Sequence, residues 1–473
     1  MIGCLELLLV APPLLWSEKR AEMKQPLNLL YLAGWLNGKG LRTEILDAAF
    51  AGLSIDQVLS IIKEREPGFV GLPFYQATVA TAFELCQAIR KEFPKIWIVA
   101  GGPAATTSTD FLLQNNAIDF CVVGEGEITL EELLRAPLGK RSAKKCRSDF
   151  DSIKGLAFKD GSKFVFTGNR QPITDLDAIP FVDFDLIDVN GYFAYHSSID
   201  MSDWLFLTTS RGCHARCTYC ATPVLWPDGL RRQSAARVLA EIKWQRQRYP
   251  TAQIGFMDDS FFSDKTWLKE FCQGIKTMKV KFCCIGRADH LTENDVKLLA
   301  ESGCIYVAFG IETGSSDRQK KLLKFLDLDR VRNTVSLLKK YEICAKGFFM
   351  LGFPDETPDE MLQTINFAVE LKALGMEEFN FFPVSIYPGT ELAKQFSPDH
   401  CVSSIYQSNA DENGPESSAE AKLLRYANIP GADINCFFNS AQILKLVKLA
   451  YLKTECGKTV DLKEIFEIVN ATD

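Results

Sequence analysis

The segment from Trp204 to Cys220, WLFLTTSRGCHARCTYC, joins a short apolar run to three closely spaced cysteines. The apolar run is typical of a buried strand. Cys213, Cys217 and Cys220 follow it in the spacing C-x3-C-x2-C, so one loop can bring three thiolates to one metal centre. Three ligands leave a four-coordinate site one position short, and an open position is what a reacting ligand requires. Soft thiolates favour zinc or an iron–sulfur cluster.

A non-catalytic protein with a structural zinc ion is the alternative that these residues leave open. In that interpretation His214 completes a Cys3His site. His214 directly follows Cys213, however, and adjacent residues are poorly placed to bind one small ion. The metal content of the purified protein, iron or zinc, separates the two hypotheses.

Strand-like and helix-like runs alternate on both sides of this loop. Downstream, six apolar runs separated by amphipathic stretches predict a six-fold (β/α)6 partial TIM barrel. Upstream, the same alternation predicts a Rossmann-like, doubly wound parallel sheet. The fold class is therefore α/β, with a small, mostly helical C-terminal region. The expected boundaries are 1–135 for the first domain, 136–200 for a linker with a hairpin at Asp160-Gly161, 201–390 for the barrel and 391–473 for the C-terminal region.

The cysteine loop resembles that of the radical SAM superfamily, whose C-x3-C-x-aromatic-C pattern is matched with Tyr219 as the aromatic residue. The resemblance implies that Cys213, Cys217 and Cys220 hold a 4Fe–4S cluster and that S-adenosyl-L-methionine (SAM) occupies the open iron. Reductive cleavage of SAM then gives a deoxyadenosyl radical. An external electron donor such as flavodoxin or ferredoxin is the implied source of the electron.

Later strand ends match the places where this family binds SAM. A carboxylate after the second barrel strand can pair with the amino group of methionine, and Arg287 after the third can reach its carboxylate. Gly310–Ser315 resembles the turn that lies against the ribose and the methionine part, and Met350–Pro354 resembles the strand edge that contacts adenine. The implied SAM contacts are Tyr219, Asp258, Asp259, Arg287, Gly310, Glu312, Ser315 and Leu351.

The first 135 residues resemble the cobalamin-binding domain of cobalamin-dependent radical SAM enzymes, the branch of methyltransferases and the anaerobic cyclase. This resemblance is carried by the runs LLLVAPP and IDFCVVGEGEITLEELL and by the Gly-Gly-Pro loop at 101–103. Together with the cysteine loop and the strand ends after it, the resemblance to this branch covers roughly residues 1–390. Ligands of such sheets lie at the carboxyl ends of the strands, where loop amides can bind the phosphate of the cobalamin tail. The expected contacts are Pro73, Phe74, Gln76, Gly101, Gly102, Pro103, Thr106, Gly124 and Glu125.

The chain departs from cobalamin domains that supply an axial histidine. Ala49 stands where a D-x-H-x-x-G loop would place that histidine, and Ala104 follows the Gly-Gly-Pro loop where many relatives have one. We therefore expect bound cobalamin to be base-off, with no protein histidine below cobalt. The alternative is a vestigial domain that binds no cofactor.

The resemblance implies a methyltransferase. The methyl group of one SAM would pass through methylcobalamin to an unactivated carbon, from which the deoxyadenosyl radical of a second SAM has abstracted hydrogen. The cofactors carry the difficult chemistry, and the protein positions them. The alternative within the same family is a cyclase, ring-contraction or rearrangement enzyme without methyl transfer. The expected substrate is a small molecule or a peptide.

The composition excludes some classes of function. With 53 Lys and Arg against 60 Asp and Glu the net charge is −7, which argues against nucleic-acid binding. No apolar run reaches the ~18 residues that span a bilayer. The opening MIGCLELLLVAPPLLW lacks a basic n-region and is interrupted by Pro12-Pro13, so we interpret it as a buried strand and a loop rather than a signal peptide. We expect a cytoplasmic enzyme without stable membrane insertion.

Overall fold

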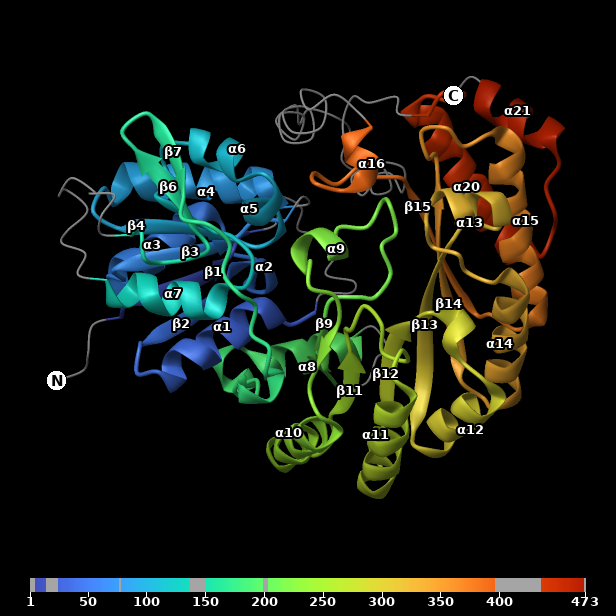
Figure 1. Cartoon of the computed structure of the whole chain (residues 1–473), viewed down its shortest axis with the longest axis horizontal. Helices are drawn as coiled ribbons and strands as arrows, with labels where there is room; N and C mark the ends of the chain where they lie inside the picture. Colours follow the sequence, from blue (N-terminus) through green and yellow to red (C-terminus); the bar gives the residue numbers. More distant parts are fainter. Residues whose placement is uncertain are drawn as a thin grey trace. The chain divides into compact units, whose positions relative to one another are not determined.

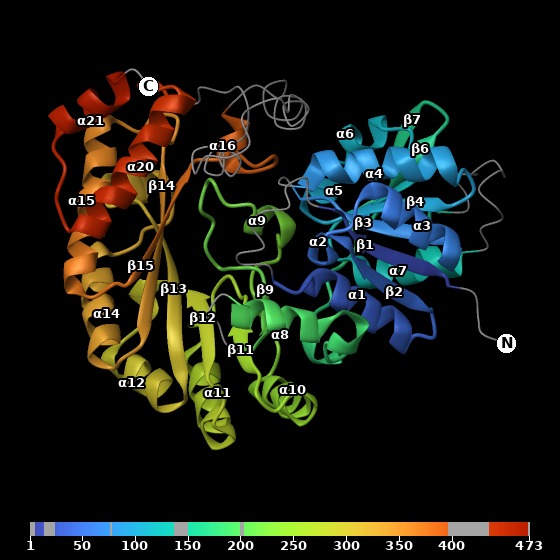
Figure 2. The ribbon, with the colours of Figure 1, turned by 180° about the vertical axis from the view of Figure 1, so that it is seen from behind.

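The structure is a computed structural model that describes residues 5–13, 24–75, 78–136, 150–198, 203–395 and 435–471. The chain divides into two compact units, Met1–Phe206 and Leu207–Asp473. Each unit is built around a β-sheet of its own (Figure 1, and from behind in Figure 2). The strand β8 (Trp204–Leu207) spans the boundary and belongs to the second sheet.

The first sheet has the strand order β2-β1-β3-β4-β5-β6-β7. Its first five strands are parallel, and the order changes direction between β1 and β3. Sheets of this kind hold their ligands at the carboxyl ends of the strands, next to such a change of direction. The parallel strands are β1 (Leu7–Ala11), β2 (Thr43–Asp47), β3 (Phe69–Pro73), β4 (Trp97–Gly101) and β5 (Phe120–Val122).

Helices cover the first sheet on both faces (Figures 1 and 2). α1 packs beside α7, and α3 packs beside α4. A capping box between Ser54 and Gln57 fixes the start of α3. The helices are α1 (Leu27–Gly38), α2 (Ala48–Ala51), α3 (Ile55–Arg65), α4 (Val79–Glu92), α5 (Pro103–Thr107), α6 (Thr109–Gln114), α7 (Gly126–Arg135) and α8 (Val189–Ser198).

The expected hairpin is present, and it forms part of the first sheet. β6 (Leu156–Asp160) pairs antiparallel with β5, and β7 (Lys163–Phe166) pairs antiparallel with β6. Gly161 in the turn has φ +61°. The sequence predicts the hairpin but not its place in the sheet, because the pairing of Phe120 with Phe158 joins positions far apart in the chain. The predicted domain boundaries stay predictions.

The second sheet has six strands in the order β15-β14-β13-β12-β11-β8, and neighbours from β11 to β15 are parallel. The order follows the chain, so the six-fold α/β arrangement predicted from the sequence is confirmed. The strands after β8 are β11 (Gln253–Phe256), β12 (Phe282–Gly286), β13 (Cys304–Glu312), β14 (Cys344–Leu351) and β15 (Glu378–Pro383). The long helices between them are α10 (Ala235–Arg248), α11 (Lys265–Met278), α12 (Glu293–Glu301), α14 (Leu328–Lys340) and α15 (Pro358–Leu374).

The C-terminal region is helical in the part that the structure describes. α20 (Ser440–Cys456) packs against α15 and β15, and α21 (Leu462–Asn470) packs against α20 and α15. The polar stretch at 403–422 lies outside the described residues. Within the described ranges, no helix is long and apolar enough to cross a membrane.

Candidate active site

The cysteine loop begins and ends at a two-stranded ribbon. β9 (Ser210–Arg211) pairs antiparallel with β10 (Arg231–Arg232), so the chain leaves and returns at the same place. Gly212 has φ +89°, and a Cβ at this position would overlap the carbonyl oxygen of Gly229. The two ends of the loop therefore touch, and any residue larger than glycine at 212 would push them apart. α9 (Thr222–Leu225) follows shortly after the third cysteine.

The three cysteines of this loop differ in burial and are linked pairwise by short-range interactions. Cys217 is buried, whereas Cys213 and Cys220 are partly exposed. The amide of Cys220 donates a hydrogen bond of 3.1 Å to the carbonyl of Cys217. Burial raises the pKa of the Cys217 thiol, and the cations of Lys324 and Arg287 oppose that shift. Arg287 also interacts electrostatically with Cys213, and Cys220 with Cys217. Arg287 therefore lies near both Cys213 and Cys217, and Cys217 lies near Cys220.

The donor set fits a 4Fe–4S cluster better than a single ion. Among the described residues, no three His, Cys, Asp or Glu side chains are gathered as one metal ion requires. In a 4Fe–4S cluster each cysteine binds a different iron, so the sulfur atoms surround the cluster without meeting at a point. Three cysteines then leave one iron open. The Cys3His zinc site that the sequence leaves open has no assembled ligand set in this part of the chain.

The two carboxylates after β11 have different environments. Asp258 is buried and accepts hydrogen bonds from the amide (3.1 Å) and hydroxyl (2.8 Å) of Thr209 and from the hydroxyl of Ser210. These bonds tie the end of β11 to the segment that leads into the cysteine loop. Asp259 is an exposed residue, but partial desolvation and the charge of Asp258 raise the pKa of its carboxyl to about 6. Asp259 is therefore the more accessible of the two predicted partners for an ammonium group.

Arg287 lies at the end of β12, where the sequence places it, and already has partners. Its Nε and Nη2 donate to the two carboxylate oxygens of Asp289 at 3.1 and 2.9 Å. Its Nη1 donates to the backbone carbonyl of Lys324 at 2.9 Å. A guanidinium has five N–H groups, so these three bonds orient Arg287 without using all of its donors. Its predicted contact with the carboxylate of SAM stays a prediction.

A buried ion pair lies at the end of β13. The Nζ of Lys324 contacts Oε1 of Glu312 at 2.8 Å and the hydroxyl of Tyr219 at 3.3 Å. A Cβ at Gly310 would overlap the Glu312 carboxylate, so this glycine makes room for the pair. Glu312 has φ +69°. The sequence predicts Gly310, Glu312 and Tyr219 as site residues but not Lys324, because a lysine between Leu323 and Phe325 has no distinguishing spacing.

Ser315 and Leu351 serve local structure as well as the predicted site. Ser315 is the N-cap of α13 (Ser316–Lys321), where its hydroxyl accepts from the amide of Arg318 at 3.4 Å. Leu351 is buried at the last position of β14. Two residues later, the Phe353 ring packs edge to face with Tyr219 of the cysteine loop, their centroids 5.9 Å apart. The predicted adenine edge therefore lies beside the predicted cluster.

In the first unit, most of the expected cobalamin contacts lie at one edge of the sheet. The amide of Phe74 donates to the carbonyl of Gly101 at 2.8 Å, and Gly102 has φ +87° with the Phe74 backbone close by. The Thr106 hydroxyl accepts from the amide of Gly124 at 3.0 Å and links the loops after β4 and β5. Phe74 itself is fully buried.

The other expected contacts flank this group. Pro73 ends β3 and is buried, Pro103 begins α5, and Oε2 of Glu125 accepts from the amide of Ile173 at 3.2 Å. Gln76 lies outside the described residues. Because these strand ends share one edge of a doubly wound sheet, they are placed where such sheets hold ligands. Their contacts with cobalamin stay predictions.

The segment after β2 forms a one-turn helix rather than a histidine loop. Asp47 caps α2 by accepting from the amide of Phe50 at 3.1 Å, and Ala49 lies within that helix. The hydroxyl of Tyr192 on α8 donates to Oδ2 of Asp47 at 2.6 Å, and its ring stacks on Phe50 with centroids 3.7 Å apart. The position that carries an axial histidine in some cobalamin domains is therefore part of a packed helical turn.

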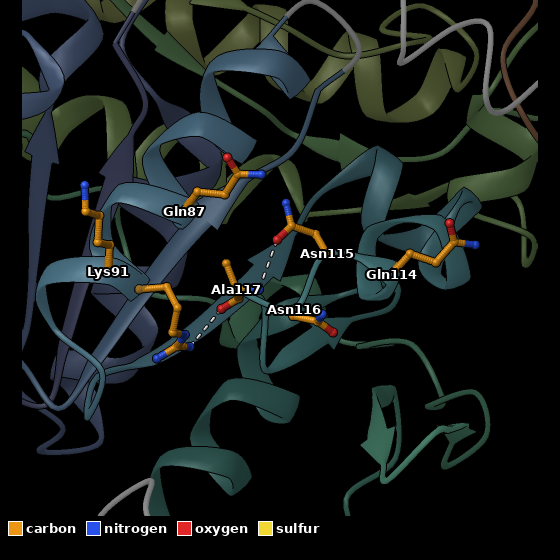
Figure 3. A pocket seen from close by; sticks show the side chains of 7 residues that line it. Gln87, Lys91, Gln114, Asn115, Asn116 and Ala117 are labelled. Atoms are coloured by element: carbon orange, nitrogen blue, oxygen red, sulfur yellow. Dashed lines mark hydrogen bonds between the residues drawn. The ribbon is translucent and has the colours of Figure 1, made fainter.

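A hollow of about 540 Å³ lies at the opposite edge of the first sheet (Figure 3). Its lining residues come from the end of α4 and the segment before β5, which are at the amino ends of β4 and β5. The guanidinium of Arg90 donates hydrogen bonds there to the carbonyls of Ile96 and Ala117, both at 2.8 Å. Because ligands of doubly wound sheets bind at the carboxyl ends, we assign no function to this hollow. It is lined by Gln87, Arg90, Lys91, Gln114, Asn115, Asn116 and Ala117.

Comparison with protein families gives one match in each unit. The B12 binding domain model matches residues 19–134, and the Radical SAM superfamily model matches residues 207–368. The chain thus combines a domain that matches the B12 binding domain model with a following domain that matches the Radical SAM superfamily model.

Characterised and uncharacterised relatives cover most of the chain. An uncharacterized methyltransferase of Pyrococcus horikoshii is 28% identical over 98% of this chain and 95% of its own length. The cytidylyl-2-hydroxyethylphosphonate methyltransferase of Streptomyces wedmorensis is 27% identical over 78% of this chain and 77% of its own. The anaerobic magnesium-protoporphyrin IX monomethyl ester cyclase of Synechocystis is 24% identical over 75% and 70%.

A solved structure has the same fold over nearly the whole chain. The radical S-adenosylmethionine methyltransferase TsrM from Kitasatospora setae, solved with its tryptophan substrate and a SAM analogue, aligns with 98% of each chain. The TM-score is 0.69 and the sequence identity 18%. This likeness supports the two-domain α/β fold.

Proposed function

We propose that this protein is a cobalamin-dependent radical SAM methyltransferase that adds a methyl group to an unactivated carbon of a small molecule or peptide. The observation that carries the proposal is the presence, in one chain, of a B12-binding domain and of a radical SAM domain with the C-x3-C-x2-C loop. The relative from Pyrococcus horikoshii, which aligns over both domains, supports the methyltransferase over the cyclase alternative.

The cluster, SAM and cobalamin supply radical formation and methyl transfer when they are bound. The chain's own residues hold and orient these groups. Three irons of the cluster would be bound by Cys213, Cys217 and Cys220. The carboxylate of Asp259 would form an ion pair with the ammonium group of the methionine part of SAM. Arg287, oriented by Asp289, binds the methionine carboxylate.

The remaining SAM contacts follow from neighbouring strand ends. The turn from Gly310 to Ser315 lies against the ribose, and the edge after Leu351 packs on adenine beside the ring of Phe353. In the first unit, Gly101, Gly102 and Gly124 allow the backbone to approach the cobalamin tail closely, because they lie at the carboxyl ends of β4 and β5. The protein works in the cytoplasm, where flavodoxin or ferredoxin supplies electrons.

The test is mass spectrometry of SAM products after anaerobic reconstitution with iron, sulfide and hydroxocobalamin. SAM with a deuterated methyl group is supplied with a strong reductant and a panel of small molecules and peptides. We expect S-adenosylhomocysteine, deoxyadenosine and label on cobalamin. Deoxyadenosine without label on cobalamin would contradict the methyltransferase and favour a cyclase or rearrangement enzyme.

A matched pair of variants connects the products to the site. Asp259→Asn keeps the size of the side chain and removes its charge, so we expect SAM affinity to fall about tenfold, as for loss of one charge-assisted contact. Glu467→Gln on α21 makes the same chemical change at an exposed position and should leave SAM binding unchanged. Equal affinity in both variants would remove Asp259 from the proposed site.

A further inference from the structure

Lys324 lies in a short loop that contacts three parts of the second unit's site: the cysteine loop, the end of β12 and the end of β13. The carbonyl of Leu322 accepts from the amide of Thr218 in the cysteine loop at 3.0 Å. The carbonyl of Lys324 accepts from Arg287 at the end of β12, and its Nζ reaches Glu312 at the end of β13. The same Nζ contacts the Tyr219 hydroxyl, which lies between Cys217 and Cys220 in the sequence.

The backbone around Lys324 has an unusual conformation. Leu323 and Phe325, its two neighbours, have φ +52° and +51°, in the left-handed region that residues with a side chain rarely adopt. Their side chains are 44% and 61% exposed, whereas that of Lys324 is 8% exposed. The loop therefore turns an apolar pair outward and a lysine inward. Strain of this kind persists where the surrounding structure holds it, often at functional sites.

Burying this ion pair is costly, and its surroundings suggest what it does. Removing a lysine and a glutamate from water costs free energy that their attraction only partly returns. The Nζ of Lys324 contacts Glu312 at 2.8 Å and the Tyr219 hydroxyl at 3.3 Å, and Tyr219 lies between two of the three cysteines, so the ion pair is next to the cysteine loop. The reduction potential of an iron–sulfur cluster depends on the charges and hydrogen bonds around it. A cation beside the cluster favours the reduced form, which carries one more negative charge, and an anion opposes it.

We propose that the Lys324–Glu312 pair sets the reduction potential of the cluster, with Lys324 raising it and Glu312 lowering it. The inference rests on the proposed function only in that the three cysteines bind a 4Fe–4S cluster. It is independent of cobalamin, of substrate and of whether the methyl group is transferred. Lys324 acts through charge and does not bind iron.

The test is a redox titration of the reconstituted cluster with dithionite as the one-electron donor, followed by electron paramagnetic resonance, in the absence of SAM, cobalamin and substrate. Lys324→Met should lower the midpoint potential, and Glu312→Gln should raise it. The double variant, Lys324→Met with Glu312→Gln, should return close to the wild-type value. Shifts of opposite sign are expected only for charges, because loss of packing would move both potentials the same way or release iron.

Lys320→Met is the matched control, since Lys320 lies on α13 with an exposed side chain paired to Asp317. The midpoint potential of the cluster in Lys320→Met should equal that in the wild-type protein. Unchanged potentials in Lys324→Met and Glu312→Gln, or shifts of the same sign, would overturn the inference. If Lys324→Met fails to hold a cluster, the potential of Glu312→Gln alone decides. A wild-type protein that assembles no cluster would instead refute the proposed function.

Discussion

The side-chain amide of Asn435 donates a hydrogen bond of 2.9 Å to the backbone carbonyl of Glu356. It also donates to the carbonyl of Phe353 at 2.7 Å, and its oxygen accepts from the amides of Phe437 and Phe438. Asn435 is buried and joins the segment before α20 to the loop after β14. That loop is the predicted adenine edge, so the C-terminal region holds a part of the proposed SAM site in place.

Asn435→Ala should therefore weaken both stability and SAM binding. Leaving buried partners without a hydrogen bond costs about 1–3 kcal/mol, and we expect the free energy of unfolding of the second unit to fall by that amount. The SAM dissociation constant, measured by equilibrium dialysis, should rise several-fold. Asn470→Ala, at the exposed end of α21, is the control. A folded Asn435→Ala protein with wild-type affinity would show that this contact does not support the site.

Cys217→Ala should abolish cluster assembly. Cys217 is the buried thiol of the three, and two cysteines cannot replace its iron ligand. Iron and sulfide content after reconstitution, and the absorbance of the cluster, should fall to background, while cobalamin binding persists because its expected contacts lie in the first unit. Cys456→Ala, at the exposed end of α20, should load iron normally. If Cys217→Ala contains as much iron as the wild-type protein, the assignment of Cys217 as a ligand of the cluster is wrong.

The sequence predicts the two sheets and the cysteine loop because their signals are local. Apolar runs alternate with amphipathic stretches, and three cysteines fall within eight residues. The pairing of β6 with β5 has no such signal, because it depends on contact between distant segments. The sequence also has no local signal that distinguishes the environment of Asp258 from that of Asp259. Adjacent aspartates look alike in a sequence, and only the structure shows that one is bound by Thr209 and the other is exposed.

The sequence does not predict Lys324 as a buried site residue, for a different reason. The run KKLLKFL reads as the end of a surface helix, in which a lysine is expected to face solvent. The helix ends at Lys321, and two residues with positive φ reverse the expected exposure, so the apolar side chains face outward and the lysine is buried. Hydropathy patterns assume regular helix or strand geometry, and they fail where the backbone is irregular.

Tyr192→Phe should destabilise the first unit modestly. The change removes the hydroxyl that donates to Asp47 but keeps the ring stacked on Phe50. A loss of about 1 kcal/mol in the free energy of unfolding is expected. Tyr192→Ala also removes a fully buried ring and should cost about 3–5 kcal/mol. Denaturant unfolding measures both. Equal losses in the two variants would show that the hydroxyl carries the whole effect.

Cobalamin bound to the first unit should have no nitrogen ligand from the protein below cobalt. Ala49 lies in the packed turn of α2 where an axial histidine would otherwise stand. After reduction of the bound cofactor to the Co(II) state, its electron paramagnetic resonance spectrum should lack splitting from a lower nitrogen. Free cobalamin in its base-on form provides the comparison, since its own base gives that splitting. A nitrogen-split spectrum from the protein-bound cofactor would contradict the expected base-off binding.

Glu356→Gln should change how stability depends on pH. Burial raises the pKa of Glu356 from 4.5 to about 7, against hydrogen bonds from the amides of Gly352 and Phe353. Between pH 4.5 and about 7, Glu356 is therefore protonated in the folded chain but ionised in the unfolded chain. The free energy of unfolding falls as the pH rises through this range, because the folded chain binds more protons than the unfolded chain. A shift of this size corresponds to about 3 kcal/mol.

Glutamine keeps an oxygen for the two amides but carries no charge at any pH. Relative to wild type, Glu356→Gln should gain stability progressively between about pH 5 and pH 8, as measured by denaturant unfolding of the second unit. Glu467→Gln, on the exposed face of α21, should follow the wild-type curve. If the difference between Glu356→Gln and wild type is constant with pH, then Glu356 is ionised in both folded and unfolded chains, and its buried charge is balanced by Arg318.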